Sequence, residues 1–265
     1  MAGIVWCVPM PKYFFNDGDF NEGYVALRND TAHHLIHALR MKAGAEVTLC
    51  DGKGMDWRGV LRETDVKRGI CRFDLSDPTP CRTELPVSVT LYQALPKGDK
   101  MELIIQKCVE LGVHKIVPLY TAHSLIRSAE KKTARYQRVA ESAAEQSMRG
   151  IVPKVAPPSA FTQAVTERDK QSRMLAALSP GEIVNFGTIC SEVRPSALHD
   201  IYCDAPSAYI DLWVGPEGGF SSEEITALFS AGAVPISLGP RVLRTETAAF
   251  TALAQINLLM EMYPL

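Results

Sequence analysis

Two short glycine-rich loops near the C-terminal end of the chain constrain its fold more than any other feature. The first, Gly215-Pro216-Glu217-Gly218-Gly219, follows the apolar run Leu212-Trp213-Val214, and the second, residues 238–244, follows Val234-Pro235-Ile236-Ser237. Each loop leads from an expected strand into an expected helix. Ligands of open α/β sheets bind at the carboxyl ends of strands, and glycine lets backbone approach a ligand closely because it has no Cβ. The pattern predicts one composite pocket with residues 244–246 at its edge.

A tight turn is the competing interpretation of each loop, because a single glycine between a strand and a helix is more often a turn residue than a ligand contact. The pair of loops weakens this interpretation. Pro216 and Pro240 stiffen loops that already contain glycine. Proline fixes φ and removes a donor, so such loops keep their shape without a ligand.

The glycine positions also argue against two common nucleotide-binding motifs. A P-loop requires a lysine after its last glycine, whereas Phe220 and Ser221 follow Gly219. A dinucleotide-binding fold, or the common open-sheet methyltransferase, places several glycines after its first strand. The first strand of this sheet is expected at residues 87–95, and the turn after it, residues 96–99, contains one glycine.

Composition indicates a cytoplasmic protein of one large or two modest domains. The chain has 265 residues, of which 46% are hydrophobic, and no apolar run reaches the ~18 residues that span a membrane. Residues 4–8 are apolar but stop at Pro9 without a basic flank, so they predict a first strand rather than a signal peptide. Seven cysteines without a C-x-x-C pair and six histidines without ligand spacing argue against disulfides and against a bound metal.

The net charge of −2 excludes a broadly basic nucleic-acid binder. Basic residues are concentrated in residues 53–72 and in residues 127–154. Local patches of this kind bind phosphates. An ordinary solvated face explains the same charges equally well.

Residues 1–75 show short strand-like runs separated by turn signals. Residues 47–50 and 57–61 flank the turn Asp51-Gly52-Lys53-Gly54 as an expected hairpin. One helix is expected over about 30–41. This pattern predicts a small β-barrel, and residues 77–80 are expected to be a linker.

From residue 87 onward, expected strands and helices alternate, which predicts an α/β domain with a parallel sheet. Further strands are expected at 115–119, 174–178 and 210–214, and a basic helix at about 131–148. Asp99 with Glu102, and Ser221 with Glu224, have the spacing of capping boxes. A last helix begins near Thr245 and carries an apolar stripe, which we interpret as core or dimer surface: Ala248, Ala249, Ala252, Leu253, Ile256, Leu259 and Met260.

With these motifs the chain resembles the bacterial 16S ribosomal RNA uridine-N3 methyltransferases of the SPOUT superfamily. The two glycine loops are similar to the signature loops of that family, the second extending to Glu246-Thr247-Ala248. Three further stretches match in order: His33-His34-Leu35 with Leu39-Arg40-Met41; Lys100-Met101-Glu102 with Gln106-Lys107 and Glu110-Leu111-Gly112; and Glu145-Gln146 with Arg149. The resemblance covers nearly the whole chain, and the poorest match is about 179–208.

The resemblance implies an N-terminal PUA-like RNA-binding β-barrel in residues 1–75 and a SPOUT methyltransferase domain in residues 83–265. It further implies a trefoil knot near 210–250, a homodimer, and bent S-adenosylmethionine held largely by backbone. The implied partner is 16S ribosomal RNA within the 30S subunit. Carried over by position, seven residues would bind the cofactor: Leu178, Gly215, Glu217, Gly218, Leu238, Gly239 and Leu243. A structural role for Glu217, as a cap of the helix after it, stays open.

The implied reaction requires removal of the uridine N3 proton or stabilisation of the anion. Arg244 would hold the negative charge that develops on a uracil oxygen. Glu246 would be the base, or it would orient Arg244 as its ion-pair partner. Arg149 would hold an RNA phosphate or assist from the second protomer. RNA affinity is assigned to the barrel, through Arg40, Lys42, Lys53, Arg58 and Arg62.

Three other functions remain open. One is a different SPOUT reaction, such as ribose 2′-O-methylation, which shares the cofactor loops and differs at the acceptor site. Another is a non-catalytic RNA-binding module, which Arg244 and Glu246 beside both loops disfavour. The third is a nucleotide-binding enzyme, which the absence of a P-loop lysine disfavours.

Overall fold

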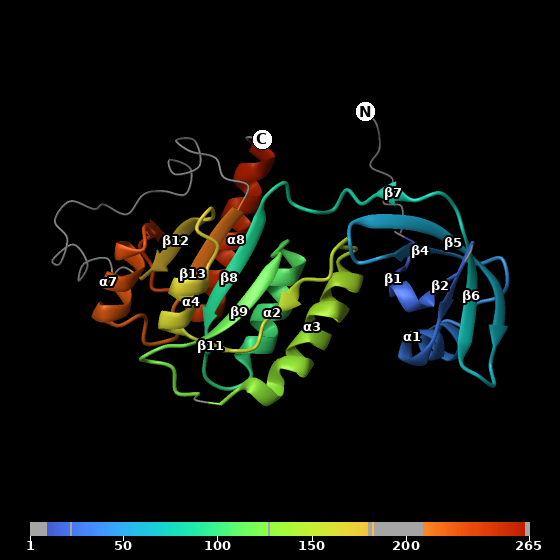
Figure 1. The fold of residues 1–265 in the computed structure, drawn as a ribbon, viewed down its shortest axis with the longest axis horizontal. Helices are drawn as coiled ribbons and strands as arrows, with labels where there is room; N and C mark the ends of the chain where they lie inside the picture. The colour runs from blue at the N-terminus through green and yellow to red at the C-terminus, as the bar shows by residue number, and fades with distance from the viewer. Residues whose placement is uncertain (1–9, 22, 127, 180–181, 183–208, 263–265) are drawn as a thin grey trace. The chain divides into compact units, whose positions relative to one another are not determined.

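The computed structural model describes residues 10–21, 23–126, 128–179, 182 and 209–262. The chain divides into two compact units (Figure 1), one of residues 1–84 with 148–152 and the other of residues 85–147 with 153–265. The strand expected at 4–8 and most of the segment 179–208 lie outside the described residues. The domain boundaries inferred from the sequence, at 75 and 83, stay a prediction.

The first unit is built on a mostly antiparallel sheet. The sheet follows the order β1-β4-β5-β6-β3-β2, with β7 beside β5. Its strands are β1 (Lys12–Phe14), β2 (Phe20–Asn21), β3 (Tyr24–Leu27), β4 (Glu46–Cys50), β5 (Met55–Asp65), β6 (Ile70–Leu75) and β7 (Thr79–Pro80). The predicted hairpin is confirmed, because β4 and β5 pair antiparallel with Leu49 opposite Trp57. The predicted linker differs, since Thr79 and Pro80 form β7.

The helix of this unit is shorter than the sequence predicted. An α-helical turn, α1 (Asn29–His33), continues as a π-helix, η2 (His34–Ala38), and a 3-10 turn, η1 (Asp17–Asp19), precedes β2. Arg40 then adopts φ +49°, a left-handed conformation that ends helices and disfavours residues with a Cβ. Leu35 is fully buried in the barrel core, so the helix closes one side of that core.

The second unit confirms the predicted parallel sheet. Every strand pair in its described part is parallel, in the order β10-β9-β8-β13-β12-β14 with β11 beside β9. The strands are β8 (Ser88–Ala94), β9 (Lys115–Tyr120), β10 (Lys154–Val155), β11 (Ser159–Ala160), β12 (Arg173–Leu178), β13 (Tyr209–Val214) and β14 (Val234–Ser237). The strands read as near-continuous apolar runs because helices cover both faces of the sheet.

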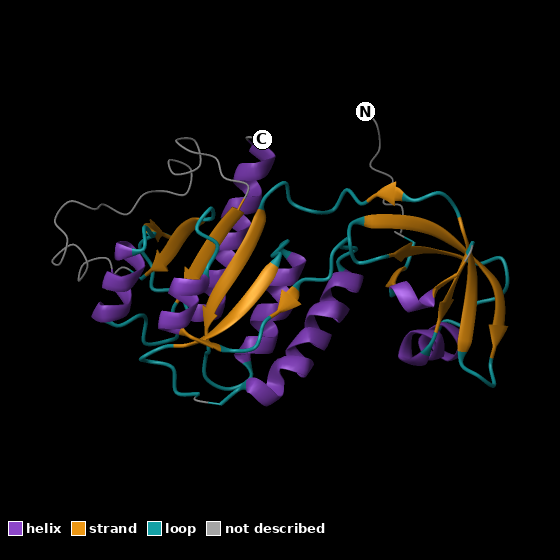
Figure 2. Ribbon diagram, viewed as in Figure 1, coloured by secondary structure: helices purple, strands orange, loops and turns teal. Residues whose placement is uncertain are grey.

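Helices cover the sheet in two groups (Figure 2). In one group α2 (Lys100–Glu110) packs against α3 (Thr133–Gln146) and α8 (Thr245–Met262), and a 3-10 turn, η3 (Glu130–Lys132), precedes α3. In the other, α4 (Phe161–Glu167) packs against α7 (Ser222–Ser230). Of the two capping boxes expected from sequence, Ser221 with Glu224 forms at α7, whereas the Asp99 side chain makes no cap bond at α2.

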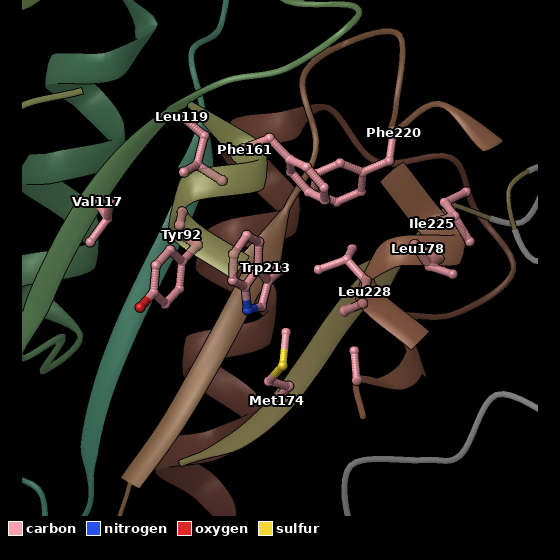
Figure 3. Packing of buried hydrophobic residues seen from close by; sticks show 13 residues of the cluster. Tyr92, Val117, Leu119, Phe161, Met174, Leu178, Trp213, Phe220, Ile225 and Leu228 are labelled. Atoms are coloured by element: carbon pink, nitrogen blue, oxygen red, sulfur yellow. The ribbon is translucent and has the colours of Figure 1, made fainter. Parts of the chain in front are cut away.

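Aromatic packing anchors one face of the sheet (Figure 3). The Trp213 ring, which is fully buried, stacks on the Tyr92 ring with centroids 4.2 Å apart, and Phe161 meets it edge-on at 5.7 Å. Phe220 continues the cluster toward α7. This packing supports β13 along its length, and the first glycine loop starts directly after that strand.

The apolar stripe of α8 faces the core of its own unit. All of its predicted members except Ala248 are buried: Ala249, Ala252, Leu253, Ile256, Leu259 and Met260. The apolar side chains that α8 leaves exposed are Leu258 and Met262, and α2 adds Leu103. These residues, rather than the stripe, are available to a partner.

Candidate functional site

Both glycine loops line one cavity at the carboxyl ends of β12, β13 and β14. The cavity encloses about 700 Å³, including the space at its mouth, which lies within the ordinary range of ligand pockets. Its lining includes all seven residues inferred from the sequence: Leu178, Gly215, Glu217, Gly218, Leu238, Gly239 and Leu243. The composite pocket expected from the loop pattern is therefore present in the fold, and the role of these seven residues in binding stays a proposal.

Close backbone packing sets the shape of the first loop. A Cβ placed on Gly218 would lie 3.1 Å from the Cβ of His123, and the His123 ring Nδ1 lies 3.0 Å from the carbonyl oxygen of Gly218. The Gly219 N–H closes a turn onto the Pro216 carbonyl at 3.0 Å. A side chain at position 218 would thus press on His123.

The second loop contains a backbone conformation that favours glycine. Gly239 has φ +105°, and a Cβ built on it meets no atom within 4 Å. Its N–H donates to the Ser237 hydroxyl at 3.3 Å. Arg241 and Val242 follow on the exposed side of the loop and also line the cavity.

A buried hydrogen-bond chain ties the two loops together beside the cavity. The Gln93 side-chain amide donates to the Thr245 hydroxyl at 2.9 Å, and that hydroxyl donates to the Gly215 carbonyl at 2.6 Å. Both side chains are almost inaccessible to solvent. Each hydroxyl has one proton and two lone pairs, so Thr245 uses its proton on the first loop while it begins the helix that follows the second loop.

A carboxylate joins the first loop to the end of β12. The Glu182 side chain accepts the Phe220 N–H at 2.8 Å and the Ser179 N–H at 2.7 Å, and it lines the cavity. Glu182 therefore holds two chain segments that border the pocket at a fixed separation.

Glu217 contacts the loop before α2 rather than the helix after it. The Lys97 N–H lies 3.2 and 3.3 Å from the two Glu217 carboxylate oxygens, and the Lys100 ammonium lies 3.0 Å from one of them. Burial opposes ionisation of Glu217, but hydrogen bonds from its own N–H, from Lys100 and from Lys97 outweigh burial and lower its pKa. Ser221 caps α7 instead, so the capping alternative for Glu217 is wrong.

Arg244 and Glu246 lie next to the cavity, outside its lining. Arg244 is exposed, and in the described part of the chain no carboxylate pairs with its guanidinium. The Glu246 side chain is 12% exposed, and it pairs with Lys100 at 3.4 Å. One of the two alternatives drawn from the sequence was an ion pair between Glu246 and Arg244. In the structure Glu246 pairs with Lys100 instead.

Arg149 belongs to the first compact unit. Its side chain is 3% exposed, and its guanidinium donates to both carboxylate oxygens of Glu84, at 3.1 Å from Nε and 2.5 Å from Nη2. The same Glu84 carboxylate accepts the Gly150 N–H at 2.8 Å. These contacts give Arg149 a structural environment, and its proposed contact with RNA stays a prediction.

The five basic residues assigned to RNA on the barrel fall into two groups. Each member of the first group forms an ion pair with a carboxylate: Lys53 with Asp17, Arg58 with Glu46, and Arg62 with Asp74. Arg40 and Lys42 are exposed, and within the described residues neither has a carboxylate partner. Of these five residues, only the two at the end of the helix carry a charge that no carboxylate of the described residues offsets.

The described residues contain no group of three or more His, Cys, Asp or Glu side chains arranged to hold a metal ion. No helix within the described ranges has the length and apolarity needed to cross a membrane. The described cysteines, Cys50, Cys71, Cys81 and Cys108, are free.

Sequence reasoning missed several residues that shape the site. Thr245 was expected at the edge of the pocket, but its contact with Gly215 was not. Lys100 lies inside a stretch that matches the family, so its position was a usable signal. Gln93, His123 and Glu182 gave no signal, because nothing in the sequence indicates which side chains fold back onto a loop about 40 to 150 residues away.

Comparison with known proteins agrees with this architecture. Residues 83–257 match the RNA methyltransferase domain family, and residues 27–74 match the RNA methyltransferase PUA domain family. Ribosomal RNA small subunit methyltransferase E of Synechocystis sp. is 38% identical over 91% of this chain and 75% of that protein. The Bacillus subtilis protein of the same name is 32% identical over 88% of this chain and 89% of its own length.

A solved structure shares the fold over nearly the whole chain. It is ribosomal RNA small subunit methyltransferase E from Neisseria gonorrhoeae bound to S-adenosyl methionine, 31% identical, with a TM-score of 0.81 over 94% of this chain and 98% of that one. On the match of two domain families and on relatives above 30% identity across both units, the chain belongs to the RNA methyltransferase family that includes ribosomal RNA small subunit methyltransferase E.

Proposed function

We propose that this protein transfers a methyl group from S-adenosylmethionine to N3 of a uridine in 16S ribosomal RNA. One observation carries the proposal: the two glycine loops, which follow β13 and β14, line a single cavity of ligand size whose walls are mostly backbone and apolar side chains. The family to which the chain belongs supports the RNA substrate, and the Neisseria gonorrhoeae protein bound to S-adenosyl methionine supports the cofactor.

The lining fits the cofactor in size and in its low charge. Its ionisable residues are Glu182, Glu217 and Arg241, and Lys100 offsets the charge of Glu217. Gly239 leaves open space beside the ligand because it has no Cβ. Bound S-adenosylmethionine would supply an activated methyl group.

Arg244 and Glu246 are proposed to act on the uracil. The Arg244 guanidinium is exposed and pairs with no carboxylate of the described residues, so it is available to stabilise negative charge on a uracil oxygen. Glu246 lies two residues further on α8, and it would accept the N3 proton. Its pairing with Lys100 means that it does not orient Arg244 by a direct ion pair. Arg149 is proposed to contact the RNA backbone.

The first unit is proposed to bind the RNA. Its match to a PUA domain family supports this role, and the unpaired Arg40 and Lys42 are the side chains most available to phosphates. Lys53, Arg58 and Arg62 are part of the same proposal, although each shares its charge with a neighbouring carboxylate.

The remaining features of the family are proposed for this chain as well. They are a trefoil knot near 210–250, a homodimer, a substrate within the assembled 30S subunit, and a cytoplasmic location. The exposed Leu103, Leu258 and Met262 on the packed helices α2 and α8 would contribute apolar area to the dimer.

Methyl transfer to purified small subunits that lack the modification tests the function. Labelled S-adenosylmethionine is incubated with these subunits or with naked 16S RNA, and the RNA is digested to nucleosides. Label in N3-methyluridine supports the proposal. Label in a 2′-O-methylated nucleoside would assign a different reaction to the same cofactor site, and cofactor binding without transfer to either RNA would contradict the proposed substrate.

A further inference from the structure

One ammonium group joins three elements at the edge of the cavity. Lys100 is the first residue of α2, and its Nζ lies 3.0 Å from a carboxylate oxygen of Glu217 and 3.4 Å from one of Glu246. Glu217 belongs to the first glycine loop and lines the cavity, whereas Glu246 lies in the first turn of α8. The contact therefore connects the cofactor side of the site to its acceptor side.

A lysine at this position is unfavourable for the helix that carries it. The N-terminal end of a helix bears a partial positive charge and favours acidic residues, by about 0.3–1 kcal/mol for an exposed charge. Lys100 occupies the first position of α2 against that preference. The compensating interactions come from outside the helix, because Glu217 and Glu246 supply the negative charge.

The surroundings provide no second cation for the two acids. In the described part of the chain Lys100 is the one basic side chain paired with Glu217 or Glu246. Two nearby basic residues pair with other acids. Lys132 lies 4.0 Å from Asp99, and Arg135 pairs with Glu102. Glu246 Oε2 is buried, and the Lys100 ammonium, 3.4 Å away, is the one cation that contacts it within the described residues. Without Lys100, two carboxylates would share this region unneutralised, and one would take up a proton more readily.

We propose that Lys100 is a positioning residue for methyl transfer, which holds Glu217 of the cofactor loop and Glu246 of α8 at a fixed separation. This inference rests on the proposed function. Lys100 acts through the two carboxylates, and it does not line the cavity. It links the shape of the cofactor loop to the charge of the group next to the acceptor.

The test compares three variants of the full-length protein. Lys100→Met removes the ammonium and keeps the length of the side chain, and Lys100→Arg keeps the charge. Lys107→Met is the matched control, because Lys107 forms an ion pair with Glu110 on the same helix, at 2.8 Å, and neither residue lines the cavity. The measurements are kcat, KM for the RNA, S-adenosylmethionine affinity by calorimetry without RNA, and the melting temperature, each across a pH series.

Lys100→Met is expected to lower kcat by about tenfold or more, the effect of losing one charged hydrogen-bond partner. The acidic limb of its kcat–pH profile is expected to move to higher pH, because Glu217 loses the ammonium group that lowers its pKa. Lys100→Arg should restore most of both properties, and Lys107→Met should match the wild type. A folded Lys100→Met protein with the wild-type kcat and pH profile would overturn the proposal, as would one that loses only melting temperature.

A second set of variants covers the case in which Lys100→Met fails to fold. Removing one carboxylate as well, in Lys100→Met/Glu217→Gln, relieves the repulsion and should restore a cooperative melting transition. A double variant that also fails to fold would contradict the link. If the wild type bound S-adenosylmethionine but methylated neither RNA substrate, the proposed function would fail, and the pH dependence of cofactor binding would still report on Lys100.

Discussion

The Thr245 hydroxyl donates to the carbonyl of Gly215 across 2.6 Å, and this contact joins two loops that are 30 residues apart in the chain. Thr245 begins α8, and Gly215 begins the first glycine loop. The same hydroxyl accepts a hydrogen bond from the buried Gln93 amide. The relative position of the two cavity walls therefore depends on one small side chain.

Thr245→Val is expected to weaken S-adenosylmethionine binding and to lower the free energy of unfolding by about 1–3 kcal/mol, since it removes the donor to the buried Gly215 carbonyl and the acceptor of one Gln93 amide hydrogen bond, which leaves Gln93 only its bond to the Ala94 carbonyl. Calorimetry and thermal unfolding measure the two effects. Thr226→Val is the matched control: its hydroxyl donates to the Ser222 carbonyl within the exposed side of α7. Equal behaviour of the two variants would show that the Thr245 contact is dispensable.

Gly239→Ala is expected to reduce cofactor affinity, because the new methyl group enters a backbone conformation of φ +105° at the cavity wall. Gly232→Ala is the control that distinguishes backbone strain from a role in the cavity. Gly232 also has a positive φ, of +90°, and a Cβ built on it meets no atom within 4 Å, but it follows α7 and does not line the cavity. Both variants should lose about 1 kcal/mol of stability. Only Gly239→Ala should bind S-adenosylmethionine more weakly, and similar affinity in both would remove Gly239 from the site.

Arg244→Ala and Arg241→Ala are expected to separate turnover from cofactor binding. Arg241 lines the cavity and Arg244 does not. If Arg244 stabilises charge on the uracil, its loss should lower kcat by roughly 10²–10³, or about 3–4 kcal/mol, and leave cofactor affinity unchanged. Arg241→Ala should mainly weaken S-adenosylmethionine binding. An Arg244→Ala enzyme with wild-type kcat and weaker cofactor affinity would place this arginine in the cofactor pocket instead.

Neutralising Arg40 and Lys42 to glutamine is expected to weaken RNA binding and to flatten its salt dependence, because each loses a free phosphate contact. Arg58→Gln should have a smaller effect, since Glu46 already neutralises its charge. Filter binding across a salt series measures both. A larger loss for Arg58→Gln than for the Arg40 and Lys42 variants would place the RNA contact on β5 instead.

The ion pair of Glu217 predicts a specific loss of stability in acid. Its folded pKa lies below the ordinary value of 4.5, so ionised Glu217 stabilises the fold above that pH, and the contribution disappears as pH falls through the folded pKa. Glu217→Gln should therefore lower the free energy of unfolding at neutral pH. Below about pH 4 the difference in free energy of unfolding between this variant and the wild type should become smaller. Urea unfolding at several pH values tests this, and a constant difference would exclude the linkage.

The sequence by itself determined the elements and most of the cavity. Alternating apolar and turn segments predict β4 with β5 as a hairpin, and β8, β9, β12, β13 and β14 as strands of a parallel sheet, because burial on both faces requires continuous apolar strands. The two-residue strands β10 and β11 were not predicted. The position of the two glycine loops after strands predicted one composite pocket, and the seven residues that the family resemblance implies all line it. These features are local or follow from sheet geometry, so they can be predicted from the sequence alone.

Only the tertiary structure decided which polar side chains meet. Lys100 replaced Arg244 as the partner of Glu246, and Glu217 turned toward the loop before α2 rather than toward α7. Asp99 and Ser221 stand in similar sequence patterns, yet Ser221 alone forms its capping box. Long charged side chains select partners by distance and burial after the chain is packed, and the energies of competing pairs differ by about 1 kcal/mol or less at exposed sites, which is too small a difference for a sequence pattern to resolve.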